Sequence, residues 1–436
     1  MRRSIIKGLC GWFRWVGLSV AVTGGSVALQ AQTVPLLQPT LPDDYNQSRN
    51  LSVAERPRPD YDPLGIRLGG FVLFPRLDLS VAATDNAFVT ASDRKEDVFG
   101  RFAPSAELRS DWGRHMLDLS GHAVFFHHAH QGALDRDTWD IRSAGRLDVG
   151  DFASLSVEGQ AAKLQEDPFT SQTDPALAVL SSYRRGRLAV RAVREAGRTR
   201  LVVSFETQHL RFGDIDFADG AAQSQAQRDR DVAIGAAQAE YALSPGAVLL
   251  ARIAYTDTDY QHRLGDGDPN RDAKAWQAVG GINLDLPDFI RGTVQLGYTR
   301  KTYRAAVYKT VDGVSGEAKL EYFLSDLMNF ELDARRTLED AATSDNNPYF
   351  ETLVSFGADR SVRANIVVGA KIGVGRQAYI GSPIRYDILQ AGAYLRYLVS
   401  HSLSLRLDGG YGKRVQPGTR SKIDQSTVMM TMELHK

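Results

Sequence analysis

Cysteine is almost absent from this sequence. The 436 residues contain a single cysteine, Cys10, which lies in a segment that we expect to be removed. A chain without thiols forms no disulfide, carries no cysteine nucleophile and offers no thiolate to a metal ion. The protein must therefore be held together by noncovalent contacts.

An excess of charge of one sign is also missing. The 52 lysines and arginines balance 52 aspartates and glutamates, so the formal net charge is zero. A balanced chain has no global field that would recruit a polyanion, and we expect no nucleic-acid partner. From Ile66 to the end no apolar run approaches the ~18 residues that mark a membrane-spanning helix. Helical membrane spans are therefore not predicted.

Motifs of catalysis are absent as well. The sequence holds no Gly-x-Ser-x-Gly elbow and no His-Glu-x-x-His pair. The stretch GVGRQA at Gly373 ends a predicted strand instead of opening a helix, so it is no dinucleotide fingerprint. We predict that the protein is not an enzyme and takes no cofactor.

Two polar clusters resemble metal sites only in part. His127, His128 and His130, with His122 nearby, form the first cluster, but His127 and His128 cannot converge without a bend, because consecutive strand residues point to opposite faces. The stretch DGDPNRD (residues 266–272) has oxygen ligands at alternate positions, as a calcium loop does. Arg271 stands where such a loop needs glycine, and Gln277 replaces its closing glutamate. We predict polar loops and no metal site.

The N-terminal residues have the layout of an export signal. Arg2, Arg3 and Lys7 precede the apolar stretch WVGLSVAV, and small residues follow, which predicts a signal peptide over residues 1–31. Residues 32–64 are rich in proline and show no apolar period, so we expect a disordered periplasmic leader. The remaining residues, 65–436, form the folded domain.

What recurs in that domain is a period of two. In IRGTVQLGYT (residues 290–299) apolar residues alternate with Arg291, Thr293 and Gln295, and LMNFELDARR (residues 327–336) repeats the pattern. A helix would scatter these charges round its axis, whereas a strand separates them onto one face. The folded domain is therefore predicted to be all-β, with one apolar and one polar face to each strand.

The interruptions between strands are alternately short and long. The eight short ones begin at Ser110, Val149, Arg194, Leu243, Leu286, Leu324, Ala358 and Val399. Nine longer polar stretches separate and flank them, which implies eighteen strands, with sixteen as the alternative. This alternation is typical of a closed, up-and-down, antiparallel transmembrane β-barrel with short periplasmic turns and long extracellular loops. Localisation in an outer membrane follows.

The apolar faces should contact lipid, and the polar faces should line the inside. Aromatic residues near the strand ends fit two interfacial girdles. We assign to them Trp112, Trp139, Tyr183, Tyr241, Tyr260, Trp276, Tyr298, Tyr322, Tyr349 and Tyr397.

Charged residues on the polar faces are the candidate functional residues. They are Arg185, Arg187, Arg191, Arg200, Glu206, Arg291, Glu331 and Asp333. An arginine-lined constriction would favour anionic solutes or acidic sugars. The alternative is a solvated wall in which acids balance the arginines.

The opening of the folded domain resembles a known family. The stretch RPRPDYDPLGIRLGGFVLFPRLDLSVAATDNAF (residues 56–88), followed by FAPSAELRSDWGRHMLDL, is similar to the start of the putative β-barrel porin 2 family of Gram-negative outer-membrane proteins. The matching positions are Pro63, Gly65, Gly70, Phe71, Pro75, Asp85, Asn86, Pro104, Ser110, Asp111, Trp112 and His115. The resemblance implies an outer-membrane barrel with no catalytic residues and a link to exopolysaccharide genes.

The function predicted from these features is a porin-like passive pore associated with exopolysaccharide export. An occluded structural or receptor barrel is the first alternative, and an outer-membrane enzyme with its site on the outer rim is the second. The expected partners are outer-membrane lipid, the barrel-assembly machinery, and polysaccharide or small hydrophilic solutes.

Overall fold

The computed structural model describes residues 50–169, 182–216, 222–263, 265, 267, 269–340, 348–419 and 422–436. These residues form one continuous antiparallel sheet of 19 strands. The three-residue β1 (Ile66–Leu68) pairs only with the first residues of β2 and does not cross the wall. Eighteen strands therefore make up the wall, as the alternation of short and long interruptions predicts.

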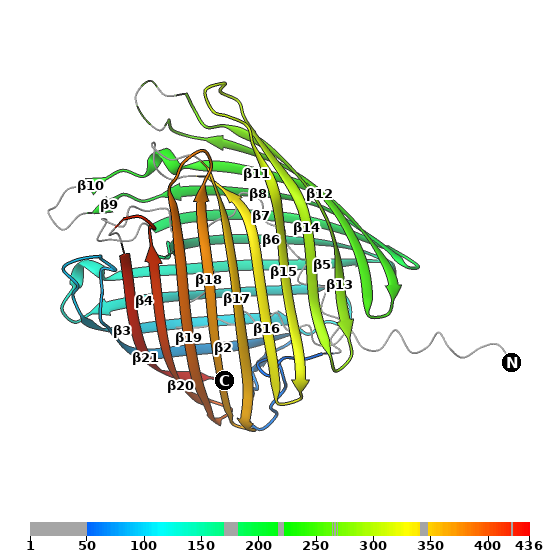
Figure 1. Cartoon of the computed structure of the whole chain (residues 1–436). Coiled ribbons are helices and arrows are strands. Elements are labelled where there is room, and N and C mark those ends of the chain that lie inside the picture. The colour runs from blue at the N-terminus through cyan, green and yellow to red at the C-terminus, as the bar shows by residue number, and fades with distance from the viewer. Residues whose placement is uncertain are drawn as a thin grey trace.

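The strands follow the chain order round the barrel (Figure 1). They are β2 (Phe71–Thr84), β3 (Asp97–Ser110), β4 (Met116–His128), β5 (Arg136–Val149), β6 (Ala153–Gln165), β7 (Ser182–Ala196), β8 (Thr199–Phe212), β11 (Arg230–Ser244), β12 (Ala247–Tyr260), β13 (Ala273–Leu286), β14 (Ile290–Tyr303), β15 (Val311–Ser325), β16 (Met328–Glu339), β17 (Tyr349–Arg363), β18 (Ile366–Tyr379), β19 (Arg385–Ser400), β20 (Leu403–Val415) and β21 (Lys422–His435).

The sheet closes on itself. The first wall strand, β2, pairs with the last, β21, from Arg76 opposite His435 to Thr84 opposite Thr427. Every strand of the wall then has two hydrogen-bonded neighbours, and no edge is left for another chain to extend. The predicted closed, up-and-down, antiparallel barrel is confirmed.

The two ends of the barrel differ in their connections. At the short-turn rim the strands are joined by two to five residues, such as 197–198 between β7 and β8 and 111–115 between β3 and β4. At the long-loop rim most connections are longer, such as 85–96 and 166–181, and the shortest is the five-residue connection 380–384 between β18 and β19. The predicted alternation of short turns and long loops is therefore confirmed.

Helix is confined to two 3₁₀ turns of three residues among the described parts of the chain. They are η2 (Gly132–Leu134) and η3 (Ala226–Arg228), both in connections of the long-loop rim. A two-residue hairpin, β9 (Ile215–Asp216) with β10 (Ala222–Gln223), precedes η3. Over the described ranges, no helix has both the length and the apolar character needed to cross a bilayer.

The wall buries its polar face and exposes its apolar one. Leu296 of β14 and Met430 of β21 are 65% and 58% exposed, whereas the polar side chains of Gln277 on β13 and Thr299 on β14 belong to residues that are only 2% and 1% exposed. In a water-soluble sandwich the large apolar side chains would be covered. Lipid is the solvent in which this exposure is favourable, so the outer face is the lipid face and the polar face lines the lumen.

Three of the residues assigned to the aromatic girdles lie inside the barrel instead. Tyr183, Tyr260 and Tyr349 are 2%, 4% and 0% exposed. Their positions along the strand place them with the lumen-facing residues, as Tyr183 shares the alternation of Arg185 and Arg187 on β7. Trp276 and Tyr298 are about half exposed on the lipid face, as a girdle requires.

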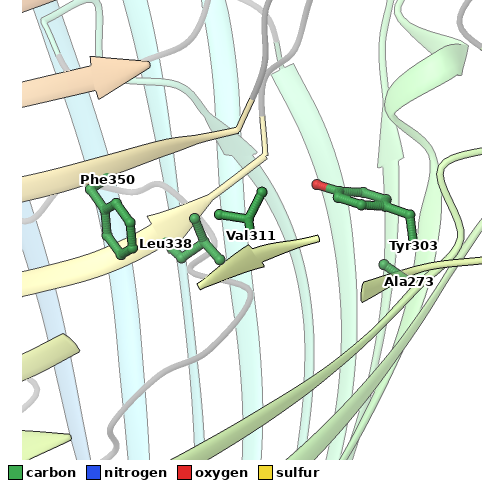
Figure 2. Close-up of a cluster of buried hydrophobic side chains, with 5 residues drawn as sticks. All are labelled: Ala273, Tyr303, Val311, Leu338 and Phe350. Atoms are coloured by element: carbon green, nitrogen blue, oxygen red, sulfur yellow. The ribbon is translucent and has the colours of Figure 1, made fainter. Parts of the chain in front are cut away.

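The end of the β16–β17 hairpin leans into the lumen at the long-loop rim. The ladder between β15 and β16 stops at Gly316 opposite Arg336, although both strands continue. Beyond that point Leu338 and Phe350 of the hairpin pack in one buried cluster with Val311 of β15 (Figure 2). Lumen-facing residues of β13 and β14 complete the cluster, so the hairpin narrows this end of the barrel.

The start of the β6–β7 connection crosses to the opposite wall. Phe169 is 3% exposed and packs against Val89, Ile388 and Ile423, which belong to the β2–β3 connection, β19 and β21. Arg414 of β20 donates a hydrogen bond to the carbonyl oxygen of Pro168, at 3.3 Å. A second inward segment therefore narrows the long-loop end.

Residues 50–62 follow the short-turn rim. Their hydrogen bonds to the wall are Asn50 Nδ2 to Asp285 Oδ1 (2.8 Å), Val53 N to Asn329 Oδ1 (2.8 Å), Arg58 Nη2 to Ser361 Oγ (3.1 Å) and His401 Nδ1 to Asp62 O (2.8 Å). These partners stretch from β13 to the β19–β20 turn. We call residues 50–62 the rim strap; residues 32–49 of the expected leader and the expected signal peptide lie outside the described residues.

Candidate functional site

The candidate site is the polar inner wall, and its best-defined part is a hollow lined by β6, β7, β8, β11 and β12. Three of the predicted residues, Arg187, Arg191 and Glu206, line this hollow. Strand alternation also turns Arg185 inward on β7, one position beyond Arg187 on the same face. The period of two places these side chains together because each pair of neighbouring strands is in continuous register there.

Arg187 is neutralised by two carboxylates. Its Nη1 lies 3.1 Å from Glu158 Oε2 on β6, and its Nη2 lies 2.8 Å from Glu206 Oε2 on β8. Glu206 also accepts a hydrogen bond from Gln208. At Arg187, acids therefore balance the charge of the arginine.

Two further predicted arginines lie toward the short-turn rim. Arg200 forms an ion pair with Glu240 at 3.3 Å. Arg291 pairs with Glu321 at 2.6 Å and with Glu55 of the rim strap at 2.8 Å, and it donates to the carbonyl oxygen of Asn50. Arg291 thus fixes the strap to the wall instead of standing free in the lumen.

The predicted acids belong to a separate part of the wall. Lys371 of β18 lies 2.6 Å from Asp333 Oδ2 and 3.5 Å from Glu331 Oε2, both on β16. The structure therefore does not gather the eight predicted residues into one constriction. Instead it distributes them over the hollow, the short-turn end and the β16–β18 wall.

A network that the sequence did not single out ties down the inward β16–β17 hairpin. Asp340 follows β16 and accepts hydrogen bonds from Lys301 Nζ (2.5 Å), Tyr303 OH (2.9 Å) and Tyr260 OH (2.5 Å). Burial raises the pKa of the Asp340 carboxyl, but the Lys301 charge outweighs this and holds that pKa far below its ordinary value. Asp340 is thus ionised and fully paired.

The two polar clusters that resemble metal sites in the sequence can be placed only in part. His127 Nδ1 lies 2.7 Å from Asp135 Oδ2 at the long-loop rim, and His130 Nδ1 lies 3.0 Å from Asp97 Oδ1. Asp266 and Asp268 of the calcium-like loop lie outside the described residues. Within the described ranges, histidine and acidic side chains form no group of three that could hold a metal ion.

Comparison with protein families gives one match over most of the chain. The family model described as putative beta-barrel porin 2 matches residues 58–436. The match begins within the rim strap and runs through the whole barrel. The comparison with curated proteins gives no match.

Several solved structures are similar in fold. The outer membrane protein OpdK from Pseudomonas aeruginosa is 11% identical, with 84% of this chain and 99% of that chain covered and a TM-score of 0.44. OccK11 (OpdR) from Pseudomonas aeruginosa is 15% identical, with 86% and 100% covered and a TM-score of 0.45. The siderophore receptor PirA from Acinetobacter baumannii is 7% identical, with 83% and 80% covered and a TM-score of 0.43. Likeness at this level gives no information about solutes.

Proposed function

Since the chain belongs to the putative beta-barrel porin 2 family, we propose that its porin-like outer-membrane barrel is a passive pore for small hydrophilic solutes. The observation that carries the proposal is the inner wall, where charged and amide side chains replace the apolar residues of the lipid face. An eighteen-stranded barrel is wide enough to keep an aqueous path between such walls. Solutes would cross by diffusion, selected by width and charge.

Small solutes are favoured over a thick polymer because the long-loop end is narrowed. The crossing segment at residues 166–169 and the inward β16–β17 hairpin both occupy space inside the wall. Glu166 also pairs with Arg228 of η3, which links the crossing segment to a second connection. Association with exopolysaccharide export and insertion by the barrel-assembly machinery stay predictions.

The test is conductance of the full chain reconstituted in planar lipid bilayers. We expect stepwise ion-conducting channels. The Phe169→Ala variant should raise the single-channel conductance, because the ring no longer anchors the crossing segment to Ile388 and Ile423. Phe152→Ala is the matched control, since Phe152 is 61% exposed at a short turn and should leave the conductance unchanged.

Three outcomes would contradict the open pore. If the wild-type barrel gave no conductance and Phe169→Ala gave channels, the barrel would be occluded by its own β6–β7 connection. If neither the wild type nor Phe169→Ala gave any conductance although both were folded, the proposed pore function would be wrong. Conductance that rises only when residues 33–63 are deleted would place the obstruction at the leader.

A further inference from the structure

We propose that the hollow beside Arg191 is a binding site for small carboxylates that carry hydroxyl groups, the chemical class of sugar acids. The site lies in the lumen wall, so the inference rests on the proposed function for the route by which a solute arrives. It adds a ligand class and a set of residues to that function.

Arg191 is the first element of the site. The register places it on β7 directly between Ser156 of β6 and Ser204 of β8, and all three line the hollow. Within the described part of the chain, Arg191 has no carboxylate at ion-pair distance. A guanidinium flanked by two hydroxyl groups presents donors that match a carboxylate together with a neighbouring hydroxyl.

The acids of the hollow are already engaged by another arginine. Glu158 and Glu206 lie one register step from Arg191, opposite Ala189, and both form ion pairs with Arg187. Arg187 offsets only one of these two negative charges, but Arg191 and Arg252 of β12 add two positive charges, so the lining carries three arginines against two carboxylates. The hollow therefore keeps a positive charge on the side where the serines stand.

A second arginine adds to that charge. Arg252 of β12 lines the same hollow and lies close enough to Arg191 for the two like charges to repel each other. Two guanidinium groups that face one hollow are stabilised when an anion occupies it. A bound cation would meet the opposite effect, so the site discriminates by sign.

The remaining lining fits the carbon skeleton of a small solute. Ile234 of β11 and Ala189 of β7 contribute apolar surface against which the C–H groups of a sugar ring can pack. The hollow opens to the lumen, so a solute can lie against these residues while the rest of it stays in the water of the lumen. The hollow thus combines a cationic end, hydroxyl groups and an apolar side, which match the three kinds of group that a sugar acid presents.

Binding can be measured on the full chain in detergent micelles by isothermal titration calorimetry, with D-glucuronate as the probe. We expect glucuronate to bind at least about tenfold more tightly than glucose, which lacks the carboxylate, because a charge-assisted contact is lost. Acetate, which lacks the ring, should also bind more weakly than glucuronate.

Two variants locate the site. Arg191→Gln should weaken glucuronate binding at least about tenfold. Lys319→Gln is the matched control, because it removes the same charge from an exposed lumen-facing position on β15 and should leave the dissociation constant within about twofold. The double variant Ser156→Ala with Ser204→Ala keeps both arginines and should weaken glucuronate more than acetate.

Folding of each variant is checked by its heat-dependent shift in electrophoretic mobility. Equal affinities for glucose and glucuronate, or equal losses in Arg191→Gln and Lys319→Gln, would overturn the site. A wild-type protein that conducts ions but shows no preference for glucuronate contradicts the site alone. A protein that binds glucuronate but seals the bilayer contradicts the pore alone.

Discussion

Asp340 is a residue at which several buried polar contacts converge. Its carboxylate accepts hydrogen bonds from Lys301, Tyr303 and Tyr260, which stand on β14 and β12. Lys301 is 1% exposed, so its ammonium group depends on Asp340 for neutralisation. The ion pair therefore stabilises the buried position of Lys301. It also holds the end of the β16–β17 hairpin in place.

Removing Asp340 should destabilise the barrel strongly. Asp340→Ala leaves the Lys301 ammonium buried without its partner, which costs about 3–5 kcal/mol. We expect a clear drop in the temperature at which the folded band is lost on electrophoresis. Asp312→Ala is the control, because Asp312 accepts its hydrogen bond from Tyr298 on the exposed face and should cost within about 0.5 kcal/mol. Equal losses in the two variants would contradict the role of Asp340.

For single residues, the alternation along a strand was a better predictor of the face on which a side chain lies than its distance from the strand end. The alternation round Gln295 placed its neighbours on the correct faces. Tyr183 was assigned to a girdle because it stands near a strand end, although its alternation with Arg185 already indicated the lumen. The Asp340 network could not be predicted, because its partners lie 37 to 80 residues away in sequence.

The rim strap is attached to the wall in part by an ion pair between Glu55 and Arg291. Burial raises the pKa of Glu55, and the charge and hydrogen bonds of Arg291 outweigh this, so that the pKa lies below its ordinary value of 4.5. A carboxyl whose pKa is lowered by its contacts stabilises them above its ordinary pKa. The contribution is lost as the pH falls through the lowered value.

Acid should therefore loosen the strap. In a Cys10→Ser background, a spin label at Ala54→Cys should be immobilised at neutral pH and gain mobility only as the pH falls below 4.5. The additional change Glu55→Gln removes the titrating group and should abolish this transition. A label whose mobility follows the same pH curve with and without Glu55 would show that another group controls the strap.

The elements were predictable where local sequence defines them. Turn residues and the period of two identified all eighteen strands. Of the eight expected short turns, one was misplaced: the turn expected at Ala358 lies at residues 364–365, because Asp359 and Ser361 remain paired with β18. Their polarity marks the lumen face and not a turn. Local sequence patterns do not predict that residues 166–169 and the β16–β17 hairpin turn into the lumen, because these positions depend on contacts with distant strands.

Two environments determine how residues are distributed in the whole molecule. Apolar side chains face lipid outside the barrel, and polar side chains face water inside it. Leu296→Arg places a charge on the lipid face of β14, where Leu296 is 65% exposed, and should cost about 2–4 kcal/mol near the bilayer midplane. We expect a smaller folded fraction in a urea series with lipid vesicles. Val307→Arg, at a 68% exposed position of a long loop, is the control and should leave the folded fraction unchanged. Equal tolerance of both arginines would contradict the lipid assignment.

The pairing of β2 with β21 makes the wall a ring in which no strand is first. Phe71 and His435 both lie at the short-turn rim, where all the other tight connections are found. A linker that joined these two positions would permit the chain to be opened at residues 326–327 instead, with the ladders between all eighteen wall strands kept. The order of synthesis and the order round the circle are thus separable, and circular permutants of this barrel share one architecture.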